Sequence, residues 1–386
     1  MSADHRRLGR ELDLFDSDPL IGAGLPFWLP AGAAARHEVE SYLYELERRA
    51  GYQHVYSPAM GKRRMYELSG HWRNFADDMF PPMRIGEDEL VLRPSLCPHH
   101  ALIFRSRGRS YRELPLRLAE LGPMYRAERS GVLGGLSRVR SMQLNDAHIL
   151  CAEDQASAEV AGVLDLMRQA HAALAMGPVS YQLSLRGPGK KYGGGDESWA
   201  RAEALLREAL GGEDYVEVPG EAAFYGPKID VQVQDPSGRE WTLATVQIDY
   251  HQPEQFELEY AEAGGGKARP VMVHRSLVGS MERLFGHLIE VHQGAFPVWY
   301  APVQLAILPV GPDQDQAARE FASQAADLRV EIHYEGSLSA RIRKNSKCPY
   351  IAVVGARDVS LRRRDGDQQV MSPAEVIESI RGLLWR

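Results

Sequence analysis

Three long stretches of the chain carry the pattern of an amphipathic helix. In residues 33–50, 155–176 and 197–210, apolar residues recur at the spacing that places them on one helical face. Glycine follows the first and third stretches, at Gly51 and Gly211, and glycine is the residue that most readily ends a helix. We therefore expect three helices within the first 211 residues.

Strand patterns lie between and after these helices. Residues 52–58, 231–234 and 241–250 read as strands, and Asp235-Pro-Ser-Gly238 between the last two is a hairpin turn signal. A further helix is expected within residues 276–293. These elements predict an antiparallel sheet flanked by helices, which extends to about residue 296.

The pattern changes to an alternation of strands and helices after Pro297. Strands are expected at 303–310, 329–334 and 350–355, with helices at 313–327, 338–345 and 372–384. The last helix opens on Ser372-Pro-Ala-Glu375, which combines an N-cap, a proline at the first helical position and a glutamate at the third. Such alternation predicts a small α/β domain with a mainly parallel sheet. The predicted fold class is α+β, with domains at 1–297 and 298–386.

Composition narrows the functional classes. The 386 residues hold 45 Lys and Arg against 52 Asp and Glu, a net charge of −7, so any contact with nucleic acid has to come from local patches. No apolar run approaches the roughly 18 residues of a membrane span, and the N-terminus lacks the apolar core of a signal peptide. Three cysteines are too few for a disulfide framework. We expect a cytoplasmic protein that does not enter the membrane.

Charged residues cluster around a glycine-rich turn in residues 125–148. Arg126 and Glu128 are two positions apart, as are Arg138 and Arg140 after the turn, so each pair would share a face if it lay on a strand. Such a hairpin presents several guanidinium groups and one carboxylate to a single ligand, and arginine suits phosphate or carboxylate recognition. The alternative interpretation is a surface hairpin with solvated charges.

These motifs resemble those of a known enzyme family. Arg126-Ala-Glu128 with its loop and second arginine resembles motif 2 of the class II aminoacyl-tRNA synthetases, and Gly279-Ser-Met-Glu-Arg283 resembles motif 3. Three further segments are similar to those of threonyl-tRNA synthetases, namely Cys97-Pro-His-His100, Asp146-Ala-His148 and Val271-Met-Val-His-Arg275. The resemblance runs from about Asp4 to about Val354.

The resemblance implies an ATP site in which Mg²⁺ accompanies the nucleotide. Arg126 would contact the α-phosphate and the substrate carboxylate, Glu128 would read adenine, and Arg138 and Arg283 would hold the triphosphate. Met142 stands where the family usually has the phenylalanine that stacks on adenine, and its thioether can still pack on a ring.

The resemblance also implies a site for threonine. Asp146 would accept a hydrogen bond from the substrate hydroxyl, while Tyr225, Lys228 and Gln247 would line the amino-acid pocket, with Lys228 among the catalytic residues. Leu144 replaces a glutamine of that pocket, which could relax or change the choice of substrate.

A zinc site is implied by the same family. Cys97, His148 and His274 match its three zinc ligands, and three protein ligands leave an open position for a substrate. Without the resemblance, each is best interpreted as an ordinary buried cysteine or core histidine. His99 stands where a glycine is usual, and an extra imidazole there could crowd the site.

The leading hypothesis is a threonine–tRNA ligase that forms threonyl-adenylate and charges tRNA as a homodimer. In the family, the helix and strand at 33–58 form motif 1 at the dimer interface. We also expect the chain to lack the N-terminal and editing domains of its bacterial relatives, because 386 residues leave no room for them.

Departures from the family pattern keep other hypotheses open. Besides Met142 and Leu144, Ser95 differs from the usual residue, and residues 355–366, in the region that reads the anticodon, are shortened. The alternatives are a tRNA-independent aminoacyl ligase that loads a carrier protein or serves a natural-product pathway, an antibiotic-resistant second copy of the synthetase, and a synthetase-like RNA-binding regulator.

Overall fold

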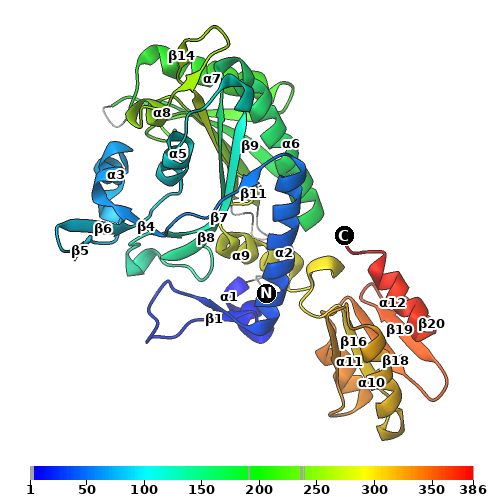
Figure 1. Cartoon of the computed structure of the whole chain (residues 1–386). Coiled ribbons are helices and arrows are strands. Elements are labelled where there is room, and N and C mark those ends of the chain that lie inside the picture. Colours follow the sequence, from blue (N-terminus) through cyan, green and yellow to red (C-terminus); the bar gives the residue numbers. More distant parts are fainter. Residues whose placement is uncertain (1–3, 190–191, 235–237, 239, 386) are drawn as a thin grey trace. The chain divides into compact units, whose positions relative to one another are not determined.

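The computed structural model describes residues 4–189, 192–234, 238 and 240–385, which group into two units (Figure 1). The larger unit comprises residues 17–26 and 43–287, and the smaller comprises the chain up to Asp16, Phe27–Tyr42 and the chain from Leu288. The turn predicted at 235–238 lies outside the described residues except for Gly238. Of the helices that the structure describes, not one combines the length and apolar character that a membrane crossing requires.

An eight-stranded sheet organises the described part of the larger unit, in the order β10-β9-β11-β12-β15-β8-β7-β3. All neighbours from β9 to β7 pair antiparallel, which confirms the predicted antiparallel sheet, while the outer strands β10 and β3 pair parallel to their neighbours. The strands are β3 (Gln53–His54), β7 (Leu116–Tyr125), β8 (Ser141–Cys151), β9 (Val179–Leu185), β10 (Tyr215–Pro219), β11 (Lys228–Gln234), β12 (Glu240–Asp249) and β15 (Val271–Ser276).

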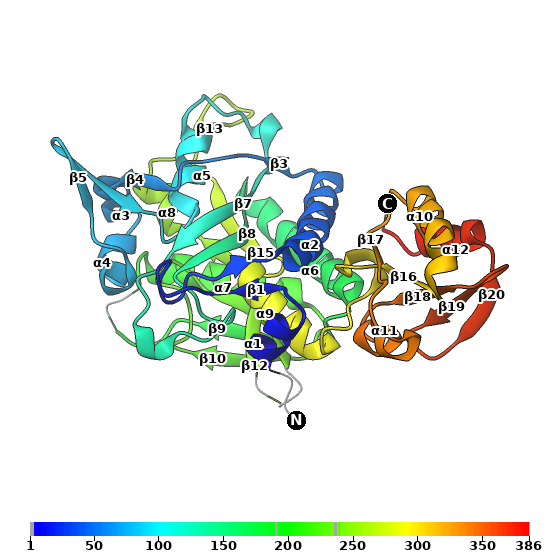
Figure 2. The same cartoon turned by 90° about the horizontal axis from the view of Figure 1, so that it is seen from below.

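Helices cover both faces of this sheet (Figures 1 and 2). Of the predicted helices, α6 (Ala156–Leu174) and α7 (Asp196–Leu210) lie within this unit, whereas α2 (Pro30–Arg49) and α9 (Met281–His292) each have residues in both units. Helix α6 packs on β12 and β15, whereas α5 (Cys97–Arg105) lies on the other side of the sheet and shares a core with β7, β8 and β15. The other elements of this unit are α3 (Arg63–Leu68), α4 (His71–Phe75), α8 (His251–Gln255), β4 (Met60–Lys62), β5 (Met83–Ile85), β6 (Asp88–Leu92), β13 (Tyr260–Ala261) and β14 (Lys267–Ala268).

Two strand predictions in this unit need correction. The strand expected at 52–58 is only the two-residue β3, because this segment is the outermost strand of the sheet and pairs with β7 over two positions. The segment does connect an antiparallel pair, β7 and β8, but Arg126, Glu128, Arg138 and Arg140 lie in the connection rather than on the strands. Because these residues are not on strands, the expectation that residues two positions apart share one face does not hold for them.

The smaller unit contains a five-stranded sheet in the order β17-β16-β18-β19-β20 among its described residues. Helices α10 and α12 pack on one face and α11 on the other (Figure 2). Its elements are α1 (His5–Glu11), β1 (Phe15–Asp16), β2 (Phe27–Trp28), β16 (Leu305–Pro309), α10 (Asp315–Gln324), β17 (Val330–Ile332), α11 (Leu338–Lys344), β18 (Tyr350–Val354), β19 (Val359–Arg363), β20 (Gln368–Met371) and α12 (Pro373–Arg381).

The prediction of a mainly parallel sheet holds for only part of this unit. Strands β17, β16 and β18 are parallel, but β18, β19 and β20 are antiparallel. The connections after β18 and β19 are short turns, and only antiparallel neighbours can be joined so briefly. The capping box of the last helix is confirmed, since Ser372 Oγ accepts from the Glu375 backbone N–H and the Glu375 carboxylate accepts from the Ser372 backbone N–H.

Candidate active site

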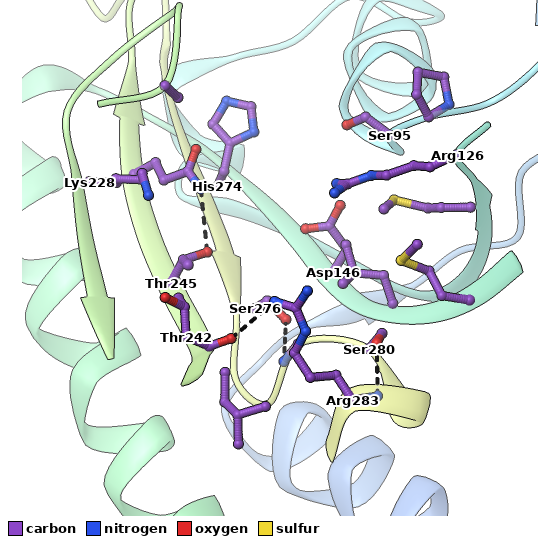
Figure 3. Close-up of a pocket in the computed structure, with 18 of the residues that line it drawn as sticks. Ser95, Arg126, Asp146, Lys228, Thr242, Thr245, His274, Ser276, Ser280 and Arg283 are labelled. Atoms are coloured by element: carbon purple, nitrogen blue, oxygen red, sulfur yellow. Dashed lines mark hydrogen bonds between the residues drawn. The ribbon is translucent and has the colours of Figure 1, made fainter. Parts of the chain in front are cut away.

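A cavity of about 550 Å³ opens in the larger unit on the face of the sheet that carries α5 (Figure 3). Strand alternation places every second residue of β8 on this face, so the strand supplies a row of side chains to the cavity. Every predicted site residue except the buried Cys97 lines it, namely Arg126, Glu128, Met142, Arg138, Asp146, His148, Tyr225, Lys228, Gln247, His274 and Arg283.

The connection between β7 and β8 brings three charged side chains to one end of the cavity. Arg126 points into the cavity (Figure 3), where it remains accessible to solvent, and desolvation by the surrounding protein atoms lowers the pKa of its guanidinium. Glu128 is buried, and its Oε2 lies 2.9 Å from NH2 of Arg138. Arg140 does not line the cavity, because its guanidinium donates to the backbone oxygens of Glu128 and Ala23. Arg138 and Arg140, which were expected to share one face, therefore have different surroundings: Arg138 lines the cavity and Arg140 does not.

Arg283, on α9, closes the same end. Its Nε donates to the backbone oxygen of Ser137 at 3.2 Å, and its NH1 donates to the backbone oxygen of Thr242 at 3.3 Å. These bonds direct the side chain across the cavity (Figure 3). Gly279 precedes this helix with a φ of +71°, and a Cβ there would lie 2.5 Å from the Leu243 oxygen. Only glycine meets both conditions, so this residue allows the turn that positions Arg283.

Polar side chains at the other end are linked to one another. Tyr225 donates its hydroxyl to Oε1 of Gln247 at 2.6 Å, and Lys228, which lies opposite Gln247 in the sheet, forms a 2.6 Å ion pair with Asp230. Burial raises the pKa of Asp146 to about 7, although the charge of nearby Arg275 acts in the opposite direction. This end therefore offers hydrogen-bond donors and acceptors in a setting poor in solvent.

The predicted zinc ligands come together. His148 on β8 lies directly opposite His274 on β15, and Cys97 is the first residue of α5, so that one donor atom from each lies within 4.8 Å of the others. One sulfur and two imidazole nitrogens form a donor set that suits zinc. Burial raises the pKa of the Cys97 thiol, and a bound cation is what would favour its thiolate. The residues present therefore fit a zinc ion.

His71 is a cavity residue that the sequence did not single out. Its Nε2 lies 3.7 Å from Cys97 Sγ and its Nδ1 2.8 Å from Ser69 Oγ, and burial lowers its pKa to about 3. It reaches the site from α4, a separate short helix, so no spacing pattern connects it with the three predicted ligands. Asp249 was also missed, although it contacts His274 at 2.8 Å.

His99 does not crowd the site as expected. It does not line the cavity, and its Nε2 lies 3.4 Å from the Met60 oxygen, because its position on α5 turns it away from Cys97. The residues that depart from the family pattern, Ser95, Met142 and Leu144, do line the cavity. They are therefore in a position to affect the fit of a substrate.

Two family models match the chain. The class II core domain of the tRNA synthetases for G, H, P, S and T matches residues 82–292, and an anticodon-binding domain matches residues 304–383. A threonine–tRNA ligase of Anoxybacillus flavithermus is 46% identical over 380 residues, which are 95% of this chain and 59% of the relative. Threonine–tRNA ligase 1 of Bacillus subtilis is 45% identical over 366 residues, covering 92% of this chain and 57% of the relative.

Solved structures show the same relationship. The chain matches a structure titled as the RNA binding domain of threonyl-tRNA synthetase from Cryptosporidium parvum with a TM-score of 0.94 and 32% identity, over 99% of both chains. A putative threonyl-tRNA synthetase from Aeropyrum pernix gives a TM-score of 0.85 at 27% identity, over 99% of this chain and 97% of that one. The chain spans about 59% of the length of the bacterial relative that matches it over 380 residues. With its matched core, its site and these relatives, the chain belongs to the class II aminoacyl-tRNA synthetases, in the threonyl-tRNA synthetase family.

Proposed function

We propose that this chain activates threonine with ATP and transfers it to tRNA. The observation that carries the proposal is that a single cavity holds both the arginine set and the histidines of the metal cluster. In the first step, a substrate carboxylate oxygen attacks the α-phosphorus, pyrophosphate leaves and threonyl-adenylate forms. In the second step, a hydroxyl of tRNA attacks the activated carbonyl and AMP leaves.

Positioning and charge are what the chain supplies to the first step. Arg126 points into the cavity beside Asp146 (Figure 3), so it can contact the α-phosphate and the attacking carboxylate together. Arg283 and Arg138 line the same end and would hold the remaining phosphates, and the buried Glu128 would accept from the adenine amino group. Mg²⁺ that enters with ATP would neutralise part of the phosphate charge.

The end of the cavity near the metal cluster would select threonine. Zinc held by Cys97, His148 and His274 would supply an open position for the amino group and hydroxyl of threonine. Asp146 lies beside His148, with its Oδ2 3.9 Å from the His148 Nε2, and would accept from the same hydroxyl. Tyr225 and Gln247 close this end through their mutual hydrogen bond. Sites built around a substrate hydroxyl reject analogues that lack it, such as valine.

ATP–pyrophosphate exchange tests the proposal. With the purified chain we expect threonine to drive exchange, and valine to be rejected by roughly 10⁴-fold in kcat/KM because the polar groups would be left without a partner. Serine, which keeps the hydroxyl, is the positive control for hydroxyl recognition. Exchange driven only by another amino acid would identify Met142 and Leu144 as changes of specificity. No exchange with any amino acid would contradict the proposal.

The acceptor, the assembly and the domain boundary are part of the same proposal. The anticodon-binding match at 304–383 favours tRNA over a carrier protein, and it supports domains at 1–297 and 298–386.

A homodimer through 33–58 is supported by exposed aromatic surface there, since Tyr56 is 90% exposed and Tyr44 is 47% exposed. Sedimentation velocity checks this, and a monomer at micromolar concentration would contradict it. A cytoplasmic location follows from a role in tRNA charging.

A further inference from the structure

A buried chain of hydrogen bonds leads away from the metal cluster. His148 Nδ1 lies 2.8 Å from Nδ1 of His100, and His100 Nε2 lies 3.2 Å from Oε2 of Glu120. All three side chains are at most 3% exposed. The function proposed above uses only the first of them, and the sequence assigns no role to the other two.

Glu120 is held as a carboxylate. Arg93 NH2 donates to its Oε1 at 3.0 Å, as does the Ser57 backbone N–H at 3.2 Å, and Ser57 Oγ donates to Oε2 at 2.6 Å. Burial alone raises the pKa of Glu120, but hydrogen bonds from His100 and Ser57 and the charge of Arg93 bring it down to about 2. An ionised carboxylate only accepts hydrogen bonds.

This fixed acceptor determines where two protons lie. His100 has to carry its proton on Nε2 in order to donate to Glu120, which leaves a lone pair on its Nδ1. His148 then has to carry its proton on Nδ1 in order to donate to His100. The remaining nitrogen of His148, Nε2, is left with a lone pair, which is the form that binds a metal.

His274, the second histidine of the metal cluster, is oriented by a single carboxylate, that of Asp249. Oδ2 of Asp249 lies 2.8 Å from His274 Nε2, and Oδ1 accepts the backbone N–H groups of His251 and Gln252 at 2.7 and 2.9 Å. These bonds to the start of α8 fix the orientation of the carboxylate. His274 therefore carries its proton on Nε2 and presents the lone pair of Nδ1.

We propose that Glu120 and His100 are positioning residues that fix the tautomer of His148, so that His148 binds the metal through Nε2 while Asp249 makes His274 bind through Nδ1. The inference rests on the zinc site of the proposed function. His148 and His274 thus present different ring nitrogens to the metal. Glu120 touches neither histidine and controls His148 through His100.

Glu120→Gln is the discriminating variant. Arg93 and the Ser57 N–H can only donate, and both bind the Oε1 position, so the amide oxygen stays there. The NH₂ group takes the place of Oε2, where the Ser57 hydroxyl can turn to accept a hydrogen bond. The NH₂ group donates to His100 Nε2, which moves the proton to Nδ1 of His100 and then to Nε2 of His148. Zinc affinity, measured by competition with a chromophoric chelator, is expected to fall roughly 10- to 100-fold.

Glu159→Gln is the matched control, because Glu159 on α6 forms a 2.6 Å ion pair with Arg117 and belongs to no group of possible metal ligands among the described residues. It should bind zinc as the unmodified chain does. Unchanged zinc affinity in E120Q would contradict the inference that Glu120 and His100 fix the tautomer of His148, but it would not contradict the zinc site itself. Failure of the unmodified chain to bind zinc would overturn both.

A second measurement does not depend on the folding of E120Q. In the zinc-free unmodified chain, ¹⁵N NMR of labelled histidines should show His100 protonated on Nε2 and His148 on Nδ1, with resonances assigned by His100→Asn and His148→Asn. Protonation of His148 on Nε2 would overturn the inference.

Discussion

Replacing Cys97 with serine is expected to remove zinc and threonine-driven pyrophosphate exchange together. The thiol is the only sulfur in the metal cluster, and a serine hydroxyl is a far weaker zinc ligand than a thiolate. Loss of a metal contact worth several kcal/mol in the transition state corresponds to roughly a 10³-fold fall in kcat/KM. Zinc content by atomic absorption and exchange with threonine are measured on the same preparation.

Cys348→Ser provides the control for this prediction. Cys348 is also buried, but its thiol donates to the backbone oxygens of Val303 and Tyr350 in the smaller unit, which a hydroxyl can also do. It should keep both zinc and exchange. A Cys97→Ser chain with full zinc content and full exchange would show that Cys97 is only a core residue.

Replacing Arg126 with glutamine is expected to lower threonine-driven exchange roughly 10²- to 10³-fold, the usual effect of removing one preorganised donor from a developing anion. Arg126 projects into the cavity beside Asp146 (Figure 3), and a neutral amide would lose both the charge and the fork that can contact two oxygens at once. The fall should appear mainly in kcat, because the α-phosphate gains negative charge in the transition state.

Arg129→Gln separates this effect from a general loss of positive charge. Arg129 belongs to the same connection but is exposed and does not line the cavity. Its exchange rate should stay within about twofold of the unmodified chain, and zinc content should be normal in both variants. Equal losses in the two variants would mean that the connection matters only through its net charge.

The chain's local patterns were sufficient to predict most elements. Helices α6 and α7 start and end close to where the helical pattern does, and the capping box at Ser372 forms as expected. These features depend on neighbours within a few residues, so the sequence contains the information directly. Strand pairing was predicted less well, because β19 and β20 form an antiparallel pair that depends on partners rather than on period.

The sequence by itself determined the residue types of the site and, through resemblance to a family, their roles. Motif order identified Arg126 and Arg283, but nothing in the spacing joined Cys97 to the two histidines. The tertiary structure decided that joining, since only the pairing of β8 with β15 places His148 opposite His274, and only the packing of α5 on the same face brings Cys97 to them. It also decided that Arg138 and not Arg140 enters the cavity, and that Glu120 stands behind His100. Those relations depend on contacts between distant segments, which no local period specifies.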